Sequence, residues 1–273
     1  MKKLIVKILN EFIKLFVKEE EKIIRSYGWS PSSPDINDFL FEDLGLVSET
    51  LPASVDLRPT CSTVFDQGNL GSCTANALVG ALEYLENKDK HKFTSLSRLF
   101  LYYNERVLEG TVRSDAGATL RDGITTLKTQ GVCPEIDWPY IESKFTSKPS
   151  KQSYTDALPD VITAYYSITN IQQMKACLAN GFPFVFGFVC YESFESDAVA
   201  KSGILPMPQK GEKQVGGHAV CCVGYDDAKQ MFLIRNSWGT DWGQAGYFWM
   251  PYAYMTTKGL ADEWFYISKD KSF

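Results

Sequence analysis

One cysteine has the surroundings of a nucleophile. Cys73 lies in residues 67–77, which read QGNLGSCTANA, and it follows a loop with two glycines. Apolar residues then recur at three- and four-residue steps as far as Leu85, which is the pattern of a buried helix face. Cys73 is therefore predicted to lie in the first turn of a helix, where unpaired N–H groups and the helix dipole favour an anion. We expect its thiol to be shifted toward the nucleophilic thiolate.

A histidine and an asparagine are placed to assist this thiol. Of the two histidines, His91 lies among charged residues in a predicted turn, so chemistry that needs an imidazole falls to His218. His218 lies in GGHAV at the mouth of a predicted strand, and Asn236 begins NSWG at the end of the next strand. An imidazole that faces a thiol needs a third group to fix its tautomer, and the Asn236 carbonyl can accept the Nδ1–H without adding charge. Trp238 would shield this hydrogen bond from water.

Each of these residues, taken singly, has a simpler explanation: a buried structural cysteine, a core histidine, or an asparagine in a turn. In this order and with their flanking residues, they resemble the papain-like cysteine peptidases. The resemblance covers residues 51–265 and is strongest in QGNLGSCTANA, GGHAV and NSWGTDWGQAGY. His218 follows Cys73 by 145 residues, within the spacing of about 130–150 residues that is typical of the family.

The resemblance implies a role for each of four residues. Cys73 is the nucleophile, His218 takes its proton and later protonates the leaving amine, and Asn236 orients His218. The side chain of Gln67 and the backbone N–H of Cys73 donate to the oxyanion. A Cys⁻/His⁺ ion pair is expected before the substrate arrives, and acyl transfer to water then proceeds through a thioester. No cofactor or metal is implied.

Further positions are expected to contact the substrate. Gly117, in DAGA, matches the loop whose glycine pairs with the substrate backbone, and Gly217 and Trp238 flank the catalytic histidine and asparagine. By the same resemblance, Asp262 or Glu263 lies at the floor of the pocket for the residue second before the scissile bond. An acidic floor would favour Arg over Leu at that substrate position.

The order of predicted elements indicates an α+β fold with two subdomains. Helical patterns precede strand patterns along the chain, so we expect a helical half over about residues 51–155 and an antiparallel, β-barrel-like half over about 156–273. The active-site cleft would lie between them. One predicted helix runs from Leu120 to Thr129, and one predicted strand from Met231 to Arg235.

Residues 1–50 resemble a short propeptide. Apolar and charged residues line opposite faces over residues 4–24, which predicts an amphipathic helix, and an extended Pro- and Ser-containing linker follows. The long prodomain that is usual in the family is absent, and the short extension looks like that of a divergent bacterial, archaeal and viral branch. We expect residues 29–40 to cross the cleft over Cys73 as an intramolecular inhibitor of a zymogen. Either removal by proteolysis or displacement while attached would activate the enzyme.

Two departures from the family pattern concern residues next to the nucleophile. Thr74 stands where the family has Trp, and Leu70 stands where it has a disulfide-bonded Cys, three residues before the nucleophile. The usual disulfide framework is therefore incomplete, and the pairing of the six other cysteines stays open.

Composition excludes several other functions. The net charge of −5 with scattered Lys and Arg argues against a nucleic-acid partner. No apolar run reaches the ~18 residues of a membrane span, and charged residues interrupt the first apolar stretch, so no cleavable signal peptide is evident. The expected partners are polypeptide substrates and the chain's own N-terminal segment.

Two alternatives remain. A silent homologue could act as a binding module, although it would tolerate loss of the catalytic residues, and all four are present. A Cys-His-Asn amidase or acyltransferase would keep the site and change the reaction, and a peptide-substrate profile would separate it from a peptidase.

Overall fold

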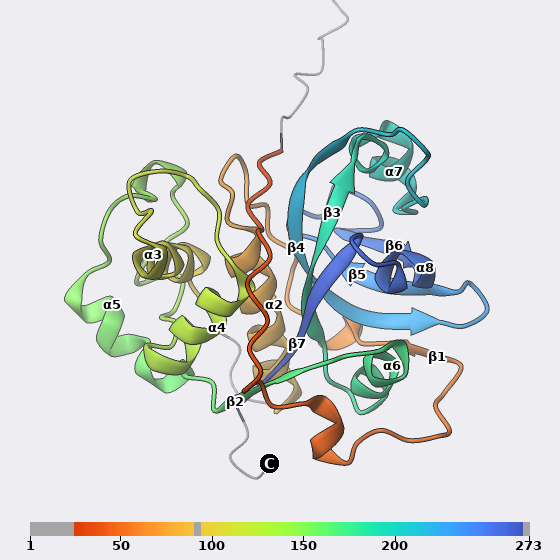
Figure 1. The fold of residues 1–273 in the computed structure, drawn as a ribbon. Helices are drawn as coiled ribbons and strands as arrows, with labels where there is room; N and C mark the ends of the chain where they lie inside the picture. The colour runs from red at the N-terminus through yellow and green to blue at the C-terminus, as the bar shows by residue number, and fades with distance from the viewer. Residues whose placement is uncertain (1–24, 90–93, 270–273) are drawn as a thin grey trace, which may run out of the picture.

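The protein has two halves with an extended segment between them. The computed structural model describes residues 25–89 and 94–269. Helices gather on one side, and a seven-stranded sheet with short helices forms the other (Figure 1). All the strand pairs of the sheet are antiparallel. The α+β fold with a helical half and an antiparallel sheet half, expected from the sequence, is confirmed.

The helical half is built around one buried helix. Its elements are α2 (Cys73–Lys88), α3 (Arg98–Glu109), α4 (Leu120–Thr129), η3 (Glu142–Lys144), α5 (Lys151–Asp156) and η4 (Leu158–Asp160). The hydroxyl of Ser97 caps α3 by accepting from the Phe100 N–H, and Thr119 caps α4 in the same way. Helix α4 can approach α2 closely because Gly123 has no side chain; a Cβ there would overlap Leu78.

The sheet half contains the remaining elements. Its strands follow the order β2-β7-β3-β4-β5-β6, and β1 pairs with β4. The strands are β1 (Ser54–Asp56), β2 (Ala164–Ser167), β3 (Phe184–Tyr191), β4 (Gln214–Asp226), β5 (Met231–Arg235), β6 (Tyr247–Pro251) and β7 (Ala261–Ser268). Short helices connect them: η1 (Phe41–Leu44), η2 (Arg58–Thr60), α6 (Ile171–Ala179), η5 (Glu192–Glu195), α7 (Asp197–Ser202) and α8 (Tyr252–Thr256).

Helix α4 and strand β5 have the predicted bounds. The start of the expected helical half differs, because β1 pairs with β4 and so belongs to the sheet. A three-residue strand is too short to show a period-2 pattern, and its pairing is not visible in the sequence.

Arg235 joins the two halves behind the site. Its guanidinium donates to the Thr63 carbonyl at 2.8 Å and to the Ser62 hydroxyl at 3.0 Å. Its path passes Gly80 on α2, where a Cβ would lie 2.9 Å from the Arg235 Nε. The end of β5, which carries Asn236, is therefore fixed against α2.

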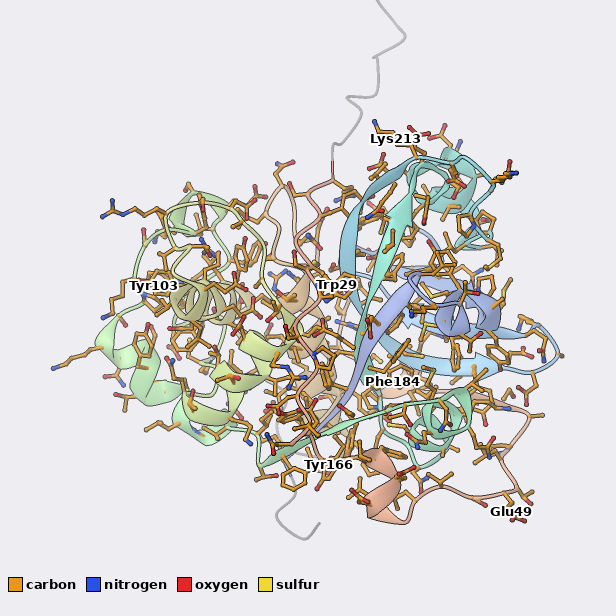
Figure 2. All side chains as sticks on the ribbon, in the orientation of Figure 1. Trp29, Glu49, Tyr103, Tyr166, Phe184 and Lys213 are labelled. Carbon is orange, nitrogen blue, oxygen red and sulfur yellow. The ribbon has the colours of Figure 1, made fainter. Side chains whose placement is uncertain are left out.

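Residues 25–32 lie along the boundary between the halves. We call residues 25–32 the strap. In Figure 1 the strap runs between the helices and the sheet, and in Figure 2 its Trp29 lies near the middle of the molecule. Trp29 is only 7% exposed. Further along, Phe41 is fully buried in the core of the sheet half, whereas Ile36 between them is 99% exposed.

Two sequence expectations fall outside the described residues, and three others, on disulfides, metal sites and membrane-spanning helices, concern residues that the structure does describe. The predicted helix of residues 4–24 and His91 lie outside the described residues. All seven cysteines lie within them and are free thiols. Within the same ranges, no cluster of His, Cys, Asp or Glu is suited to a metal ion. Over those ranges, too, no helix combines the length and the apolarity that crossing a membrane requires.

Candidate active site

Cys73 is the first residue of α2 and is completely buried. The backbone groups of Ala219, Gly28 and Thr74 lie near its sulfur, where their N–H groups favour the thiolate and lower its pKa. Ala219 follows His218 on β4, so the start of α2 and the middle of β4 bring the thiol and the imidazole to one place. The strap contributes the third neighbour, Gly28.

His218 and Asn236 are in direct contact. The Nε2 atom of His218 lies 2.8 Å from the Asn236 Oδ1, and that same oxygen accepts from the Ser237 N–H at 2.9 Å. Since the carbonyl oxygen can only accept, Nε2 carries the proton. The Nδ1 atom is buried and has no hydrogen-bond partner among residues 25–89 and 94–269. The sequence prediction named Nδ1 as the donor and was wrong, because the asparagine, at the end of β5, approaches the other edge of the ring.

Trp238 covers the imidazole. The two rings are stacked, with centroids 5.1 Å apart and planes at 27°. Trp238 is only 3% exposed, and the strap covers it further, because the Arg25 guanidinium lies 5.1 Å from its ring centre. This position fits the expected shielding of the His218–Asn236 hydrogen bond.

Gln67 is held by its neighbours with its amide toward the strap. Its Oε1 accepts from the Ser237 hydroxyl at 2.5 Å, so its Nε2 is turned the other way. That nitrogen donates to the Leu70 carbonyl at 2.9 Å and to the Ser26 carbonyl of the strap at 3.3 Å. The side chain that was expected to bind an oxyanion therefore binds a backbone carbonyl oxygen here.

Strap residues pair with backbone groups on both sides of Cys73. The Trp29 N–H donates to the Gly217 carbonyl at 3.0 Å. On the other side, the Ala118 N–H donates to the Gly28 carbonyl at 2.7 Å, and the Ser30 N–H donates to the Ala118 carbonyl at 3.3 Å. Residues 26–30 thus lie over the site, slightly before the segment 29–40 that the sequence indicated.

Gly117 does not itself make this backbone pairing. Its N–H donates to the Tyr102 hydroxyl at 3.2 Å, and the neighbouring Ala118 pairs with the strap. Gly117 is instead required for close approach: its φ is 76°, and a Cβ there would overlap the Gly28 carbonyl. A Cβ on Gly28 would in turn overlap the carbonyl of Gly71. The strap passes over the site at a point where three glycines meet.

Trp29 lies against the predicted acidic residues. Its indole Nε1 donates to the Glu263 Oε2 at 2.8 Å, and the Ser32 N–H donates to the Oε1 at 3.0 Å. Asp262 instead accepts from the Glu263 N–H and lines, with Trp29 and Leu260, a cavity of about 410 Å³. Of the two candidates, Glu263 is the one that contacts the strap.

Burial keeps the thiol and the imidazole neutral. It raises the pKa of Cys73 to about 11, although three backbone N–H groups oppose this shift. Burial also lowers the pKa of His218 to about 4, against the effect of its hydrogen bond with Asn236. The expected thiolate and ion pair are therefore not favoured while the strap is in place. Desolvation of the thiol outweighs the effect of the nearby backbone N–H groups, and the sequence pattern alone could not compare the two.

Glu105 is a buried acid that the sequence analysis missed. It lies on α3, is fully buried, and its Oε2 accepts from the Thr74 hydroxyl at 2.8 Å. Burial raises its pKa to about 8. Nothing in the sequence pattern of α3 distinguishes Glu105 from a surface glutamate. The one sequence signal is Thr74, which stands where the family has Trp and whose hydroxyl donates to Glu105.

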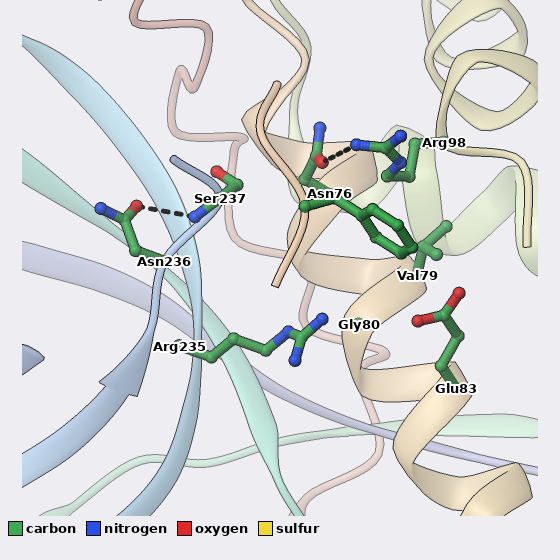
Figure 3. Close-up of a pocket in the computed structure, with 9 residues that line it drawn as sticks. Asn76, Val79, Gly80, Glu83, Arg98, Arg235, Asn236 and Ser237 are labelled. Atoms are coloured by element: carbon green, nitrogen blue, oxygen red, sulfur yellow. Dashed lines mark hydrogen bonds between the residues drawn. The ribbon is translucent and has the colours of Figure 1, made fainter. Parts of the chain in front are cut away.

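A small polar cavity lies behind Asn236. Its volume is about 10 Å³, and it is lined from α2 by Asn76 and Gly80 and from the other half by Arg235, Asn236 and Ser237 (Figure 3). This space is about that of one water molecule. The Nδ2 of Asn236 is buried without a partner in the part of the chain that the structure describes, and it points away from the cavity (Figure 3).

Comparison with known proteins places this site in a family. The family description "Papain family cysteine protease" matches residues 51–267. An uncharacterized peptidase C1-like protein, L477, of Acanthamoeba polyphaga mimivirus is 40% identical over 273 residues, covering 90% of this chain and 88% of its own. Cathepsin B-like CP3 of Giardia intestinalis is 32% identical, covering 75% of this chain and 71% of its own.

Two solved structures of cysteine proteases are similar to this chain. The crystal structure of xylellain, a cysteine protease from Xylella fastidiosa, superimposes with a TM-score of 0.85 at 44% identity, covering 90% of this chain and 97% of its own. Digestive procathepsin L 3 of Tenebrio molitor, at 22% identity and a TM-score of 0.65 over 81% of this chain and 72% of its own, shares the fold.

Proposed function

We propose, on the premise that the chain belongs to the papain family of cysteine proteases, that it is made as a zymogen in which the strap blocks a Cys73–His218–Asn236 site. The protease class follows from the family. The residue roles and the inhibition by the strap are inferred from the contacts described above.

The proposed chemistry uses the nitrogen of His218 that Asn236 leaves free. Nδ1 takes the proton of the Cys73 thiol, and the sulfur attacks the peptide carbonyl. The Gln67 Nε2 and the Cys73 N–H donate to the resulting oxyanion. Nδ1–H then protonates the departing amine, leaving a thioester. A water molecule gives its proton to Nδ1 as its oxygen attacks, and collapse of this second tetrahedral species releases the acid and the thiol.

One observation carries the proposal of inhibition: the Ser26 carbonyl of the strap hydrogen-bonds to the Gln67 Nε2. A substrate oxyanion would need that same donor. The strap is also covalently linked to the site that it covers, so its high effective concentration makes even a modest fit sufficient.

The direction of the strap supports its resistance to cleavage. Its backbone runs from Ser26, beside Gln67, to Trp29, beside Glu263. By family resemblance, the pocket near Asp262 and Glu263 receives a residue that precedes the scissile bond, so a substrate would run from these acidic residues toward Cys73. The strap runs the opposite way and therefore does not present a peptide bond in the substrate orientation.

The strap also acts on the charge state of the site. Tyr27 of the strap packs against the His218 ring and so contributes to the burial that lowers the pKa of His218, and the charge of Arg25 lowers it further. Departure of the strap would admit water and so favour the thiolate and the imidazolium. We therefore infer that the strap inhibits in two ways, by occupying the site and by keeping its groups neutral.

The test uses the full chain and a peptide epoxide that alkylates thiols. We expect slow labelling of wild type, faster labelling of a variant with a displaced strap, and a single adduct on Cys73 by intact mass. Hydrolysis of peptide substrates should rise in parallel. Equal labelling rates in the two proteins would show that the strap does not inhibit, and labelling without peptide hydrolysis would favour an amidase or acyltransferase.

A further inference from the structure

The loop before the nucleophile lacks the disulfide that is usual at this position in the family. Leu70 stands three residues before Cys73, where the family has a disulfide-bonded Cys, and all seven cysteines of the chain are free. This loop contains Gln67 and leads into Cys73, so a loose loop would misplace both. Some other contact must fix it to the rest of the helical half.

A hydrogen-bonded pair of side chains makes this contact. The Gly71 N–H donates to both carboxylate oxygens of Asp115, at 3.0 Å each. The Tyr102 hydroxyl donates to the Asp115 Oδ1 and accepts from the Gly117 N–H at 3.2 Å. Tyr102 comes from α3 and is completely buried. One continuous chain of hydrogen bonds therefore joins Gly71 to Gly117.

We infer that Asp115 and Tyr102 form a polar clamp that positions the nucleophile loop against the loop that pairs with peptide backbone, in place of the missing disulfide. Both are positioning residues, since they act through Gly71 and Gly117. Their effect on catalysis rests on the proposed function; their effect on loop position does not.

The clamp connects two functional parts of the site. Gly71 is two residues before Cys73, and Gly117 precedes Ala118, which pairs with Gly28 and Ser30 of the strap. The spacing is tight, because a Cβ on Gly71 would lie 3.4 Å from the Asp115 Oδ1. A change in the clamp would therefore alter both the oxyanion side and the backbone-pairing side of the site.

A carboxylate suits this position. Its two oxygens can accept several hydrogen bonds, and those to a charged acceptor are stronger than those between neutral groups. Burial, and then the hydrogen bond with Asp115, raise the pKa of Tyr102, so its hydroxyl keeps the proton that it donates. Unlike a disulfide, these bonds do not depend on an oxidant.

The first test is amide hydrogen exchange in the full chain, read in peptides that cover residues 67–73 and 114–119. We expect Asp115→Ala to speed exchange by ~10-fold in both segments, as loss of a charge-assisted hydrogen bond implies, while residues 77–88 of α2 stay protected. Asp115→Asn keeps an acceptor oxygen and should exchange within ~3-fold of wild type, a smaller loss because one of its hydrogen bonds is retained.

Tyr102→Phe removes only a hydroxyl and should speed exchange mainly in residues 114–119. Tyr84→Phe is its matched control, since the Tyr84 hydroxyl bonds to the Gly181 carbonyl, away from the clamp. Asp156→Ala is the control for the loss of an acid, because its carboxylate accepts from Gln152. Exchange in residues 67–73 of Asp115→Ala at the wild-type rate would overturn the clamp. Faster exchange throughout the helical half would also overturn it in favour of a general structural role.

The second test separates kcat from KM in enzyme that has been activated. Because Gln67 and Cys73 share the clamped loop, Asp115→Ala should lower kcat by ~10-fold or more, and Asp115→Asn should restore most of it. An unchanged kcat in Asp115→Ala would reject the clamp's part in catalysis. If wild type has no peptidase activity, the proposed function fails, and the exchange experiment still decides whether the clamp exists.

Discussion

The indole nitrogen of Trp29 donates to the carboxylate of Glu263 at 2.8 Å, which joins the strap to strand β7 beside the cavity that Trp29 and Asp262 line. The residue that the strap uses for attachment is thus one of the two acidic residues, Asp262 and Glu263, that are expected to select substrates. Glu263 has a φ of 59° and is 9% exposed, so its carboxylate is aimed by an uncommon backbone conformation.

The position of the strap should be most sensitive to substitution at Gly28, where a side chain would overlap the Gly71 carbonyl. We expect Gly28→Ala to displace the strap and to raise the labelling rate of Cys73 by a peptide epoxide by at least ~10-fold, because removing even a modest closure energy changes a population by that factor. Ile36→Ala is the control, since the side chain of Ile36 is almost fully exposed and lies outside the strap. The prediction fails if both variants label like wild type.

Glu263 should determine the preference for the second residue before the scissile bond. In the Gly28→Ala background we expect Arg to be preferred over Leu, and Glu263→Gln to remove that preference by ~10-fold or more, as the loss of a charge-assisted hydrogen bond implies. Competing peptide substrates with the two side chains would measure it. Asp262→Asn is the matched control. If Asp262→Asn removes the preference and Glu263→Gln does not, Asp262 and not Glu263 determines the selectivity.

The four residues proposed to be catalytic should differ in their effects on turnover. Cys73→Ala should abolish peptide hydrolysis without unfolding the chain, and His218→Ala should be nearly as severe because the two act as one unit. Gln67→Ala should lower kcat by ~10²-fold if its amide is one of two oxyanion donors. Asn236→Ala should be milder. Turnover of Cys73→Ala within tenfold of wild type would refute its role as nucleophile.

The strap should shift the pH at which Cys73 reacts. With the strap in place, burial raises the pKa of Cys73 to about 11, so alkylation by iodoacetamide should accelerate only as the pH approaches that value. In Gly28→Ala, hydration of the site lowers this pKa, and the rise should come at a lower pH. Superimposable pH–rate curves for the two proteins would show that the strap does not control the thiol.

Glu105 should make stability depend on pH. Its pKa in the folded protein is about 8, above the ordinary value of 4.5, so between these values the folded state holds a proton that the unfolded state has released. Stability from this group therefore falls as the pH rises through that window. We expect the melting temperature of Glu105→Gln, relative to that of wild type, to increase as the pH rises from 5 to 8. A constant difference would show that Glu105 does not titrate there.

The sequence predicted those features that depend on neighbouring residues in the chain. The apolar period that follows Cys73 located its helix, and two strand patterns brought His218 and Asn236 near each other, because such patterns record which face of an element is buried. The choice of ring nitrogen was beyond this reasoning, since it depends on the direction from which Asn236 reaches the ring. The charge state of Cys73 was missed for a related reason, because the residues around Cys73 in the sequence do not indicate that a distant segment buries it.

The clamp and the choice of Ala118 over Gly117 were missed because they involve contacts between loops. Asp115 and Tyr102 are distant from Gly71 in the sequence and carry no periodic pattern. The absence of a cysteine at Leu70 was the only signal, and it indicated a missing support without naming its replacement.

The burial of Phe41 bears on what a cut in the exposed stretch around Ile36 would produce. Residues from Asp38 onward would stay in place, because Phe41 is anchored in the core and Asp38 binds the Arg121 guanidinium at 2.7 and 2.8 Å. The strap would leave as a free peptide and would then compete with substrate as a separate molecule. We therefore expect activation by such a cut to be incomplete at high protein concentration and to progress on dilution.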